Sequence, residues 1–81
     1  MHTSIEISLY PLDADFIPPI QDFIDRLNLD SRVRVVTNSM STQVFGPYDD
    51  VMGLLTRELR GTFERKKAVF VMKVLGPLPE A

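Results

Sequence analysis

Cysteine is absent from this sequence, and its absence excludes several kinds of protein. Without a thiol there can be no disulfide framework, no thiolate nucleophile and no thiolate metal site. The absence also fits the reducing cytoplasm, where we expect the protein to be located. Histidine is almost as scarce: the one residue of this type, His2, lies at an end that we expect to be frayed, and we assign it no role. We therefore expect neither a metal centre nor a cofactor.

The sequence also lacks a large excess of charge of one sign and any long apolar run. The formal net charge is −2, so the chain as a whole produces no field that would attract nucleic acid or anionic lipid. No apolar stretch is long enough to cross a bilayer, and residues 1–4 lack the basic end and apolar run of a signal peptide. We therefore expect neither nucleic acid nor a membrane to be a partner.

The composition is that of an ordinary globular domain, with 44% hydrophobic and 25% charged residues. A length of 81 residues predicts a single domain over residues 1–81. A chain this short buries only about 60% of the surface that its unfolded state exposes. Self-association is a natural way for so small a domain to bury more of its surface.

Two patterns predict the first strand and the first helix. Residues 4–10 alternate between apolar and polar side chains, which is typical of a half-buried strand. Apolar residues then recur at helical spacing, with Asp15 as the expected N-cap, and predict a helix over about 16–28. Pro18 and Pro19 suit its first turn, because the backbone N–H groups there lack intrahelical partners in any case.

The second half of the chain predicts another helix and another strand. Apolar positions at helical spacing begin at Tyr48, and the basic residues 65–67 are expected at the last turn of this helix, where its dipole favours them. Residues 68–75 are almost wholly apolar and predict a strand, which we expect Gly76 and Pro77 to end.

The centre of the chain, residues 33–46, predicts a β-hairpin with a two-residue turn at Ser39–Met40. The expected pairs are Asn38 with Ser41, Thr37 with Thr42 and Val35 with Val44. A shift by one residue would turn the valines outward, which argues against it. The expected helix-covered face contains Val33, Val35, Thr37, Thr42 and Val44, and the open face contains Arg34, Val36, Asn38, Ser41, Gln43 and Phe45.

The element order βαββαβ predicts an α+β sandwich of ferredoxin-like fold. Right-handed crossovers then require an antiparallel sheet of strand order 4-1-3-2 with both helices on one face. In this topology the end of the first strand (residues 10–15), the start of the first helix, the hairpin turn (residues 38–41) and the connection at residues 65–67 lie at one pole. Polar segments converge there, so we expect the functional site at this pole.

The hairpin turn is rich in side chains that form hydrogen bonds. Positions 37–43 contain six of them: Thr37, Asn38, Ser39, Ser41, Thr42 and Gln43. Hydroxyl and carboxamide groups both donate and accept, so they can complement a ligand that has both kinds of group. Each residue taken alone has an ordinary explanation, since threonine is common in strands and asparagine and serine are common in turns. Their concentration is what favours a small-molecule site.

Four stretches resemble the YkoF-type thiamine/hydroxymethylpyrimidine-binding family: residues 7–12, 16–18, 37–46 and 48–52. The resemblance extends over nearly the whole chain, and its most specific part is the run MSTQVFG from Met40 to Gly46. It implies a ferredoxin-like module that binds thiamine or its pyrimidine moiety without transforming it, and hence a protein that is not an enzyme. Family members include chains with two such modules, so the resemblance implies that this single module pairs with another copy.

Geometry and the matched stretches together select the candidate ligand-binding residues. Tyr10 or Phe16 could lie against the flat ring, and an aromatic face also suits the thiazolium cation of thiamine. Glu6 or Asp13 could neutralise the positive charge of that cation. The full predicted set is Tyr10, Phe16, Thr37, Asn38, Ser39, Met40, Ser41, Thr42 and Gln43.

Other functions compete with this one. RNA binding on the open sheet face would require aromatic residues and a basic surface, whereas the third strand offers only Phe45 there. An enzyme would require a partner for one of its acids, and Glu6, Asp13 and Asp15 are paired with neither a histidine nor a cysteine. The main alternative is an oligomeric regulatory or interaction module of the same fold that binds a different small ligand.

The open sheet face also predicts how copies associate. Val36, Phe45, Val69 and Val71 are expected on it among polar residues, which makes it too apolar to leave wholly to water in so small a domain. We expect two copies to pack these faces together, as a homodimer or a dimer of dimers, with a symmetric contact.

Overall fold

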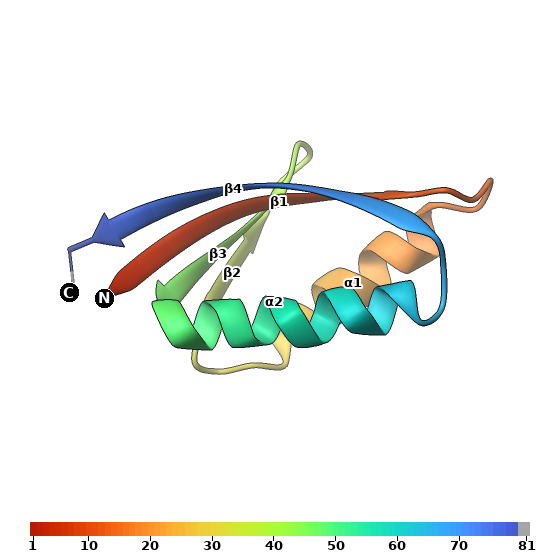
Figure 1. Cartoon of the computed structure of the whole chain (residues 1–81). Coiled ribbons are helices and arrows are strands. Elements are labelled where there is room, and N and C mark those ends of the chain that lie inside the picture. Colours follow the sequence, from red (N-terminus) through yellow and green to blue (C-terminus); the bar gives the residue numbers. More distant parts are fainter. Residues whose placement is uncertain (80–81) are drawn as a thin grey trace.

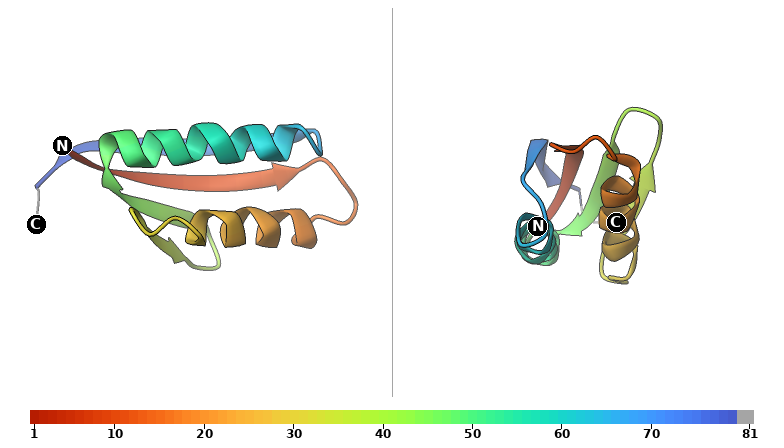
Figure 2. Two further views of the ribbon diagram at one scale, coloured as in Figure 1. Left: turned by 90° about the horizontal axis from the view of Figure 1, so that it is seen from below. Right: turned by 90° about the vertical axis from the view of Figure 1, so that its right-hand side faces the viewer.

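A computed structural model describes residues 1–79 of the chain. Its elements are β1 (His2–Pro11), α1 (Ile17–Asn28), β2 (Arg34–Thr37), β3 (Thr42–Pro47), α2 (Tyr48–Phe63) and β4 (Ala68–Leu78). The strands form one antiparallel sheet of order β2-β3-β1-β4, and both helices lie against one face of it (Figure 1, Figure 2). This is the predicted ferredoxin-like sandwich, because the order 2-3-1-4 is 4-1-3-2 counted from the other edge. The predicted single domain extends over residues 80–81, which lie outside the described residues, and it stays a prediction.

The core lies between the sheet and the two helices. Alternate side chains of β1 are buried, as the period-two pattern predicts, because successive residues of a strand point to opposite faces of the sheet. The helices and β3 supply the remaining core residues. The buried apolar residues are Ile5, Ile7, Leu9, Phe23, Leu27, Val44, Val51, Leu54 and Leu55.

The first turn of α1 differs from the prediction. Phe16 is the N-cap and no side chain caps the helix, so the prediction that Asp15 is the N-cap is wrong. The Asp15 N–H donates to the Asp13 carboxylate at 3.1 Å, within the turn that precedes the helix. Two prolines follow in the first turn, where a missing N–H costs no intrahelical hydrogen bond, and their fixed φ suits the helical backbone.

α2 ends before the basic residues that follow it. The helix ends at Phe63, so residues 65–67, which were expected in its last turn, lie in the connection to β4. The N–H groups of Arg65 and Lys66 donate to the Thr62 carbonyl at 3.0 and 2.9 Å, which satisfies the helix end as the chain turns back. Within residues 1–79, neither helix has the length and apolar character that would be needed to cross a membrane.

The outer ends of β1 and β4 pair farther than the sequence predicts. β1 extends to His2, which lies opposite Pro47 and Leu78, so the expectation of a frayed end is wrong. β4 likewise continues through residues 76–77, which were expected to end it. The register shifts by one residue between His2 and Ser4, so residues 76 and 77 of β4 lie opposite Thr3 alone. An edge strand tolerates proline because one of its sides needs no ladder hydrogen bonds.

The central hairpin has the predicted register. The observed pairs include Val35 with Val44 and Thr37 with Thr42, and the Asn38 N–H donates to the Ser41 carbonyl at 3.0 Å. In an antiparallel pair, hydrogen-bonded pairs of opposite residues alternate with pairs that are not hydrogen-bonded. Because Asn38 bonds Ser41, Thr37 and Thr42 form a pair of the second kind, whose side chains come closer together. The turn itself projects away from the sheet (Figure 1).

Candidate functional site

The strands at the predicted pole end at different places, and this leaves a notch in the sheet. β3 pairs with β1 only as far as Thr42 and Ile7, whereas β1 continues to Pro11 alongside β4. The hairpin turn rises away from the sheet near the same point (Figure 1). A pocket of about 180 Å³ lies between the end of β1, the hairpin turn and α1. We call this pocket the hairpin notch.

Uncharged residues line the whole of the hairpin notch. The lining residues are Ile7, Ser8, Leu9 and Tyr10 from β1, Ile20, Phe23 and Ile24 from α1, and residues 37–42 from the hairpin. Apolar walls with a few placed polar groups are typical of small-molecule sites. The volume is smaller than the roughly 300–1,000 Å³ of most ligand pockets, so the notch suits one small ring.

The structure brings most of the predicted site residues together. Tyr10 and residues 37–42 line the hairpin notch, which is seven of the nine. Phe16 is not among the lining residues, and it lies exposed at the start of α1. Gln43 is outside as well, because it follows the buried Thr42 in β3 and therefore points to the open face of the sheet. A ligand contact stays a prediction for all nine residues.

Sequence reasoning missed several walls of the notch. Ser8 and Leu9 lie where β3 has left β1, and Ile20 and Ile24, one turn apart on α1, line the notch from the helix. The helical spacing of the two isoleucines is visible in the sequence. It marks them only as part of the apolar face of α1, however, and the position of the hairpin is needed to separate pocket from core.

Asn38 organises the hairpin turn. Its carboxamide oxygen accepts hydrogen bonds from the N–H groups of Met40 and Ser41, at 2.8 and 3.0 Å. This is the local side-chain bonding that makes asparagine favourable in turns. The carboxamide nitrogen has no hydrogen-bond partner within residues 1–79 and can donate to a ligand. The turn is therefore held in shape before any ligand arrives.

Thr37 and Thr42 are hydrogen-bonded to each other, with 3.1 Å between their hydroxyl oxygens. This contact places the two side chains on the same face of the hairpin, as predicted. Thr42 is buried and Thr37 is exposed, because Thr37 belongs to the edge strand β2. One hydroxyl donates within the pair and the other keeps its own O–H, so the pair can still both donate and accept.

The main chain of Leu9 also faces the hairpin notch. The Leu12 N–H donates to the Lys67 carbonyl at 3.2 Å, in line with the register of β1 and β4. Hydrogen-bonded pairs alternate along such a ladder, so Ser8 and Tyr10 direct their backbone groups toward β4 and Leu9 directs its groups the other way. Since β3 pairs with β1 only up to Ile7, the Leu9 N–H and C=O point into the notch. They offer one donor and one acceptor side by side.

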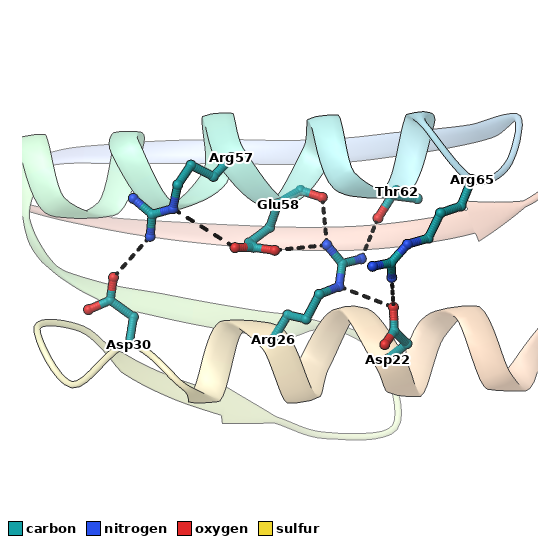
Figure 3. A network of polar contacts seen from close by, with 7 residues as sticks. All are labelled: Asp22, Arg26, Asp30, Arg57, Glu58, Thr62 and Arg65. Atoms are coloured by element: carbon teal, nitrogen blue, oxygen red, sulfur yellow. Dashed lines mark hydrogen bonds and ion pairs between the residues drawn. The ribbon is translucent and has the colours of Figure 1, made fainter.

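A second pocket, of about 230 Å³, lies between the start of α1 and the end of α2. Its lining residues are Asp15, Pro18, Pro19, Asp22, Arg26, Thr62, Arg65 and Lys66. Most of its charged groups bind one another: Arg26 and Arg65 contact the Asp22 carboxylate at 3.1 and 2.8 Å (Figure 3).

Arg26 joins the two helices through the same network. Its guanidinium donates to the side chain and the carbonyl of Glu58 at 2.8 and 3.1 Å, and to the Thr62 hydroxyl at 2.8 Å (Figure 3). Gly61 makes room for it, because a Cβ there would lie 2.7 Å from a guanidinium nitrogen. These charges neutralise one another within the fold, so we place the candidate site at the hairpin notch.

The two carboxylates that were expected to neutralise a cationic ligand lie elsewhere. Glu6 is 3.8 Å from Lys73, and Asp13 is 2.6 Å from Lys66. The hydrogen bond from Lys66 lowers the pKa of the Asp13 carboxyl below its usual range, and the Asp15 N–H adds to this effect. Neither carboxylate lines the notch. Within residues 1–79, no group of three or more histidine, aspartate or glutamate side chains is placed to hold a metal ion.

Solved structures of the same fold come from distant organisms. Protein SP2199 from Streptococcus pneumoniae is 22% identical, with a TM-score of 0.87, over 96% of this chain and 89% of that one. Protein MJ1052 from Methanocaldococcus jannaschii is 18% identical, with a TM-score of 0.82, over 99% and 84% of the two chains. Protein TM0486 from Thermotoga maritima, described as a candidate thiamine biosynthesis/salvage protein, is 15% identical, with a TM-score of 0.70, over 91% and 82%. At these identities the likeness shows the fold.

Membership of a family is shown by the sequence match. No curated protein matches the chain. Residues 2–74 do match the family described as the YKOF-related family, and this match includes β1, both helices, the hairpin and most of β4. The resemblance of residues 7–12, 16–18, 37–46 and 48–52 is therefore confirmed at the level of the family. The chain belongs to the YkoF-related family.

Proposed function

We propose that this protein binds thiamine or its hydroxymethylpyrimidine moiety without transforming it, and acts in the carriage, salvage or sensing of thiamine or its precursor. The observation that carries the proposal is the hairpin notch, a small uncharged pocket that combines apolar walls with hydroxyl, carboxamide and main-chain groups. Membership of the YkoF-related family and the fold shared with the Thermotoga maritima thiamine biosynthesis/salvage candidate support it.

The polar groups of the notch match the edge of an aminopyrimidine. Such a ring has an exocyclic amine, which donates, beside a ring nitrogen, which accepts. The Leu9 C=O and N–H offer the complementary acceptor and donor. The Thr37–Thr42 hydroxyl pair and the Asn38 carboxamide offer further groups of both kinds. Ile20 and Ile24 supply an apolar wall for the ring, and Tyr10 can lie against its face.

The uncharged lining also predicts the order of affinity among possible ligands. A phosphate ester would have to leave water for a pocket with no cation among its lining residues, which is costly unless the charge is paired. We expect hydroxymethylpyrimidine and thiamine to bind, and thiamine diphosphate to bind at least tenfold more weakly, which corresponds to about 1.4 kcal/mol. Calorimetric titration with these ligands, and with unrelated cationic and aromatic metabolites, measures this order.

The same incubations test whether the protein is an enzyme. At a ligand concentration of about one hundred times Kd, binding to the native state alone adds about 2.7 kcal/mol of stability, so the melting temperature should rise clearly. Mass spectrometry should recover the ligand unchanged. A new product would contradict the proposal. A phosphate ester that binds best would leave a binding role but contradict the uncharged notch as its site.

The second candidate function is the oligomeric regulatory or interaction module for another small ligand. It is favoured if a member of the unrelated panel binds and the pyrimidines do not. Under either function we propose that two copies pack their open sheet faces together, as a dimer or a tetramer. Val36, Val69 and Val71 are exposed on that face, whereas the Arg34 guanidinium covers the Phe45 ring at 4.4 Å from its centroid.

Light scattering tests the open-face contact. At micromolar concentration we expect the mass of a dimer or a tetramer, and Val36→Lys should lower it, because the change places a charge in an apolar contact. Ser31→Lys, an exposed change in the connection before β2, is the matched control. A wild-type monomer would contradict the open-face proposal.

A further inference from the structure

β4 has one side that no strand of the described chain covers. It is one of the two edge strands of the sheet, it is 11 residues long, and β1 is its neighbour. Leu12 and Lys67 form a hydrogen-bonded pair, and such pairs occur at every second residue along an antiparallel ladder. The odd-numbered residues of β4 therefore direct their backbone groups to β1. Phe70, Met72 and Val74 therefore direct their N–H and C=O groups outward. This edge is a row of backbone donors and acceptors that a further strand can pair with.

Between positions 68 and 75 the β4 edge has few of the features by which proteins protect edge strands. Such strands are usually short, charged, bulged or interrupted by proline. Here the register with β1 is regular from Ser4–Leu75 to Pro11–Ala68, and proline occurs only at position 77. The one charged residue between positions 68 and 78 is Lys73. The other edge strand, β2, is protected in these ways, since it is 4 residues long and contains Arg34.

Apolar side chains are exposed on both sides of the same strand. Between 40% and 63% of the surface of each is accessible to solvent: Val69, Val71, Met72, Val74 and Leu75. Successive residues of a strand point to opposite faces of the sheet, so these exposed apolar side chains lie on both faces and not on the open face alone. A strand laid along the edge would cover side chains on both faces, whereas sheet-on-sheet packing would cover those on one.

We propose that the β4 edge pairs antiparallel with the β4 edge of a second copy of this chain, so that two sheets join into one continuous sheet. A two-fold axis makes such a contact self-matching, because each copy supplies the same strand. It also avoids charge conflict. Only a register that sets Lys73 opposite Lys73 brings like charges together, and neighbouring registers set Lys73 opposite an apolar residue. An edge without other charges has little by which to select a different protein electrostatically.

This contact is independent of the proposed ligand site. The hairpin notch lies on the β3 side of β1, whereas the pairing edge lies on the far side of β4. Joining two copies at β4 therefore leaves both notches open. It also differs from the open-face contact, which uses side chains of the sheet face and no backbone groups.

Amide hydrogen exchange measured by NMR separates the two contacts residue by residue. In the associated protein, the amides of Phe70, Met72 and Val74 should exchange at least about 100-fold more slowly than in an unstructured chain, because they would be hydrogen-bonded to the second copy. The amides of Val69 and Val71 point to β1 and should be protected in any case. Unprotected outward amides in the associated protein would overturn the proposal, even if the protein is a dimer.

A proline substitution provides the second measurement. Met72→Pro removes an outward N–H but no hydrogen bond to β1, so the protein should fold and its mass by analytical ultracentrifugation should fall twofold. Met72→Val keeps the N–H and should keep the wild-type mass. If Met72→Pro does not fold, the double variant Met72→Lys/Val74→Lys, which charges the edge, takes its place and should show the same twofold fall. An unchanged mass in a folded edge variant would overturn the proposal.

Discussion

Replacing Thr37 and Thr42 together with valine should weaken the binding of hydroxymethylpyrimidine or thiamine by about a hundredfold or more. The two hydroxyls are bonded to each other at 3.1 Å in the hairpin notch. If they also bond the ligand, their loss leaves ligand groups buried without partners, at about 1–3 kcal/mol for each. Since a factor of ten in Kd corresponds to about 1.4 kcal/mol, two lost partners give the expected change.

The stability of the ligand-free protein should change little in the same variant. Removing both partners of a hydrogen bond leaves neither group unsatisfied, and valine has nearly the shape of threonine. Thr3→Val is the matched control, because Thr3 is buried at the far end of β1 and bonds the Leu75 carbonyl at 2.7 Å. It should cost about 1 kcal/mol of stability and leave the affinity unchanged.

The two measurements are the melting temperature without ligand and the Kd by calorimetry, for the wild type, the double variant and the control. If the folded double variant binds as tightly as the wild type, the two threonines have only a structural role in the hairpin and the ligand contacts lie elsewhere. If both variants lose affinity equally, the effect does not come from the notch.

Replacing Arg26 with leucine should destabilise the protein by about 2 kcal/mol. The side chains of Arg26 and Glu58 are only 15% and 19% exposed. Removal of the arginine leaves the largely buried Glu58 carboxylate and the buried Thr62 hydroxyl without the donor that they share. Breaking a fully buried ion pair costs about 3–5 kcal/mol. We expect less here because water still reaches the pair.

For a domain of this size, a loss of about 2 kcal/mol lowers the melting temperature by roughly 8–16 °C. Arg65→Leu is the control: it removes a cation from the same network, but its side chain is 61% exposed, so the change should stay within about 0.5 kcal/mol. Thermal unfolding of both variants measures the difference. Ligand affinity should be unchanged in each, and a large loss of affinity would mean that the pocket between the helices takes part in binding.

Much of the fold follows from local pattern. The alternation in residues 4–10 and the helical spacing after Tyr48 specify which side chains turn inward, because strands and helices have fixed periods. The hairpin register follows for the same reason, since a shift by one residue would expose Val35 and Val44. Right-handed crossovers then determine the strand order. The family is also accessible from the sequence, because the match depends on residues and not on their contacts.

The ends of the helices and strands are harder to predict from the sequence, because they depend on partners that are distant in the sequence. β4 continues through residues 76–77 because the first residues of β1 remain alongside it, and α2 ends at Phe63 because the chain has to turn back to meet Leu12. Each of these outcomes depends on a contact that competes with the local preference.

The sequence by itself therefore determined the sandwich, the hairpin and the kinds of polar group at the pole. The tertiary structure decided that β3 separates from β1 after Ile7, which opens the hairpin notch and turns the Leu9 backbone into it. It also decided that Phe16 and Gln43 lie outside the notch and that Ile20 and Ile24 line it. The physical reason is that periodicity specifies the direction of a side chain within its own element. Where two elements stop relative to each other depends on long-range packing, and a pocket forms where they stop at different places.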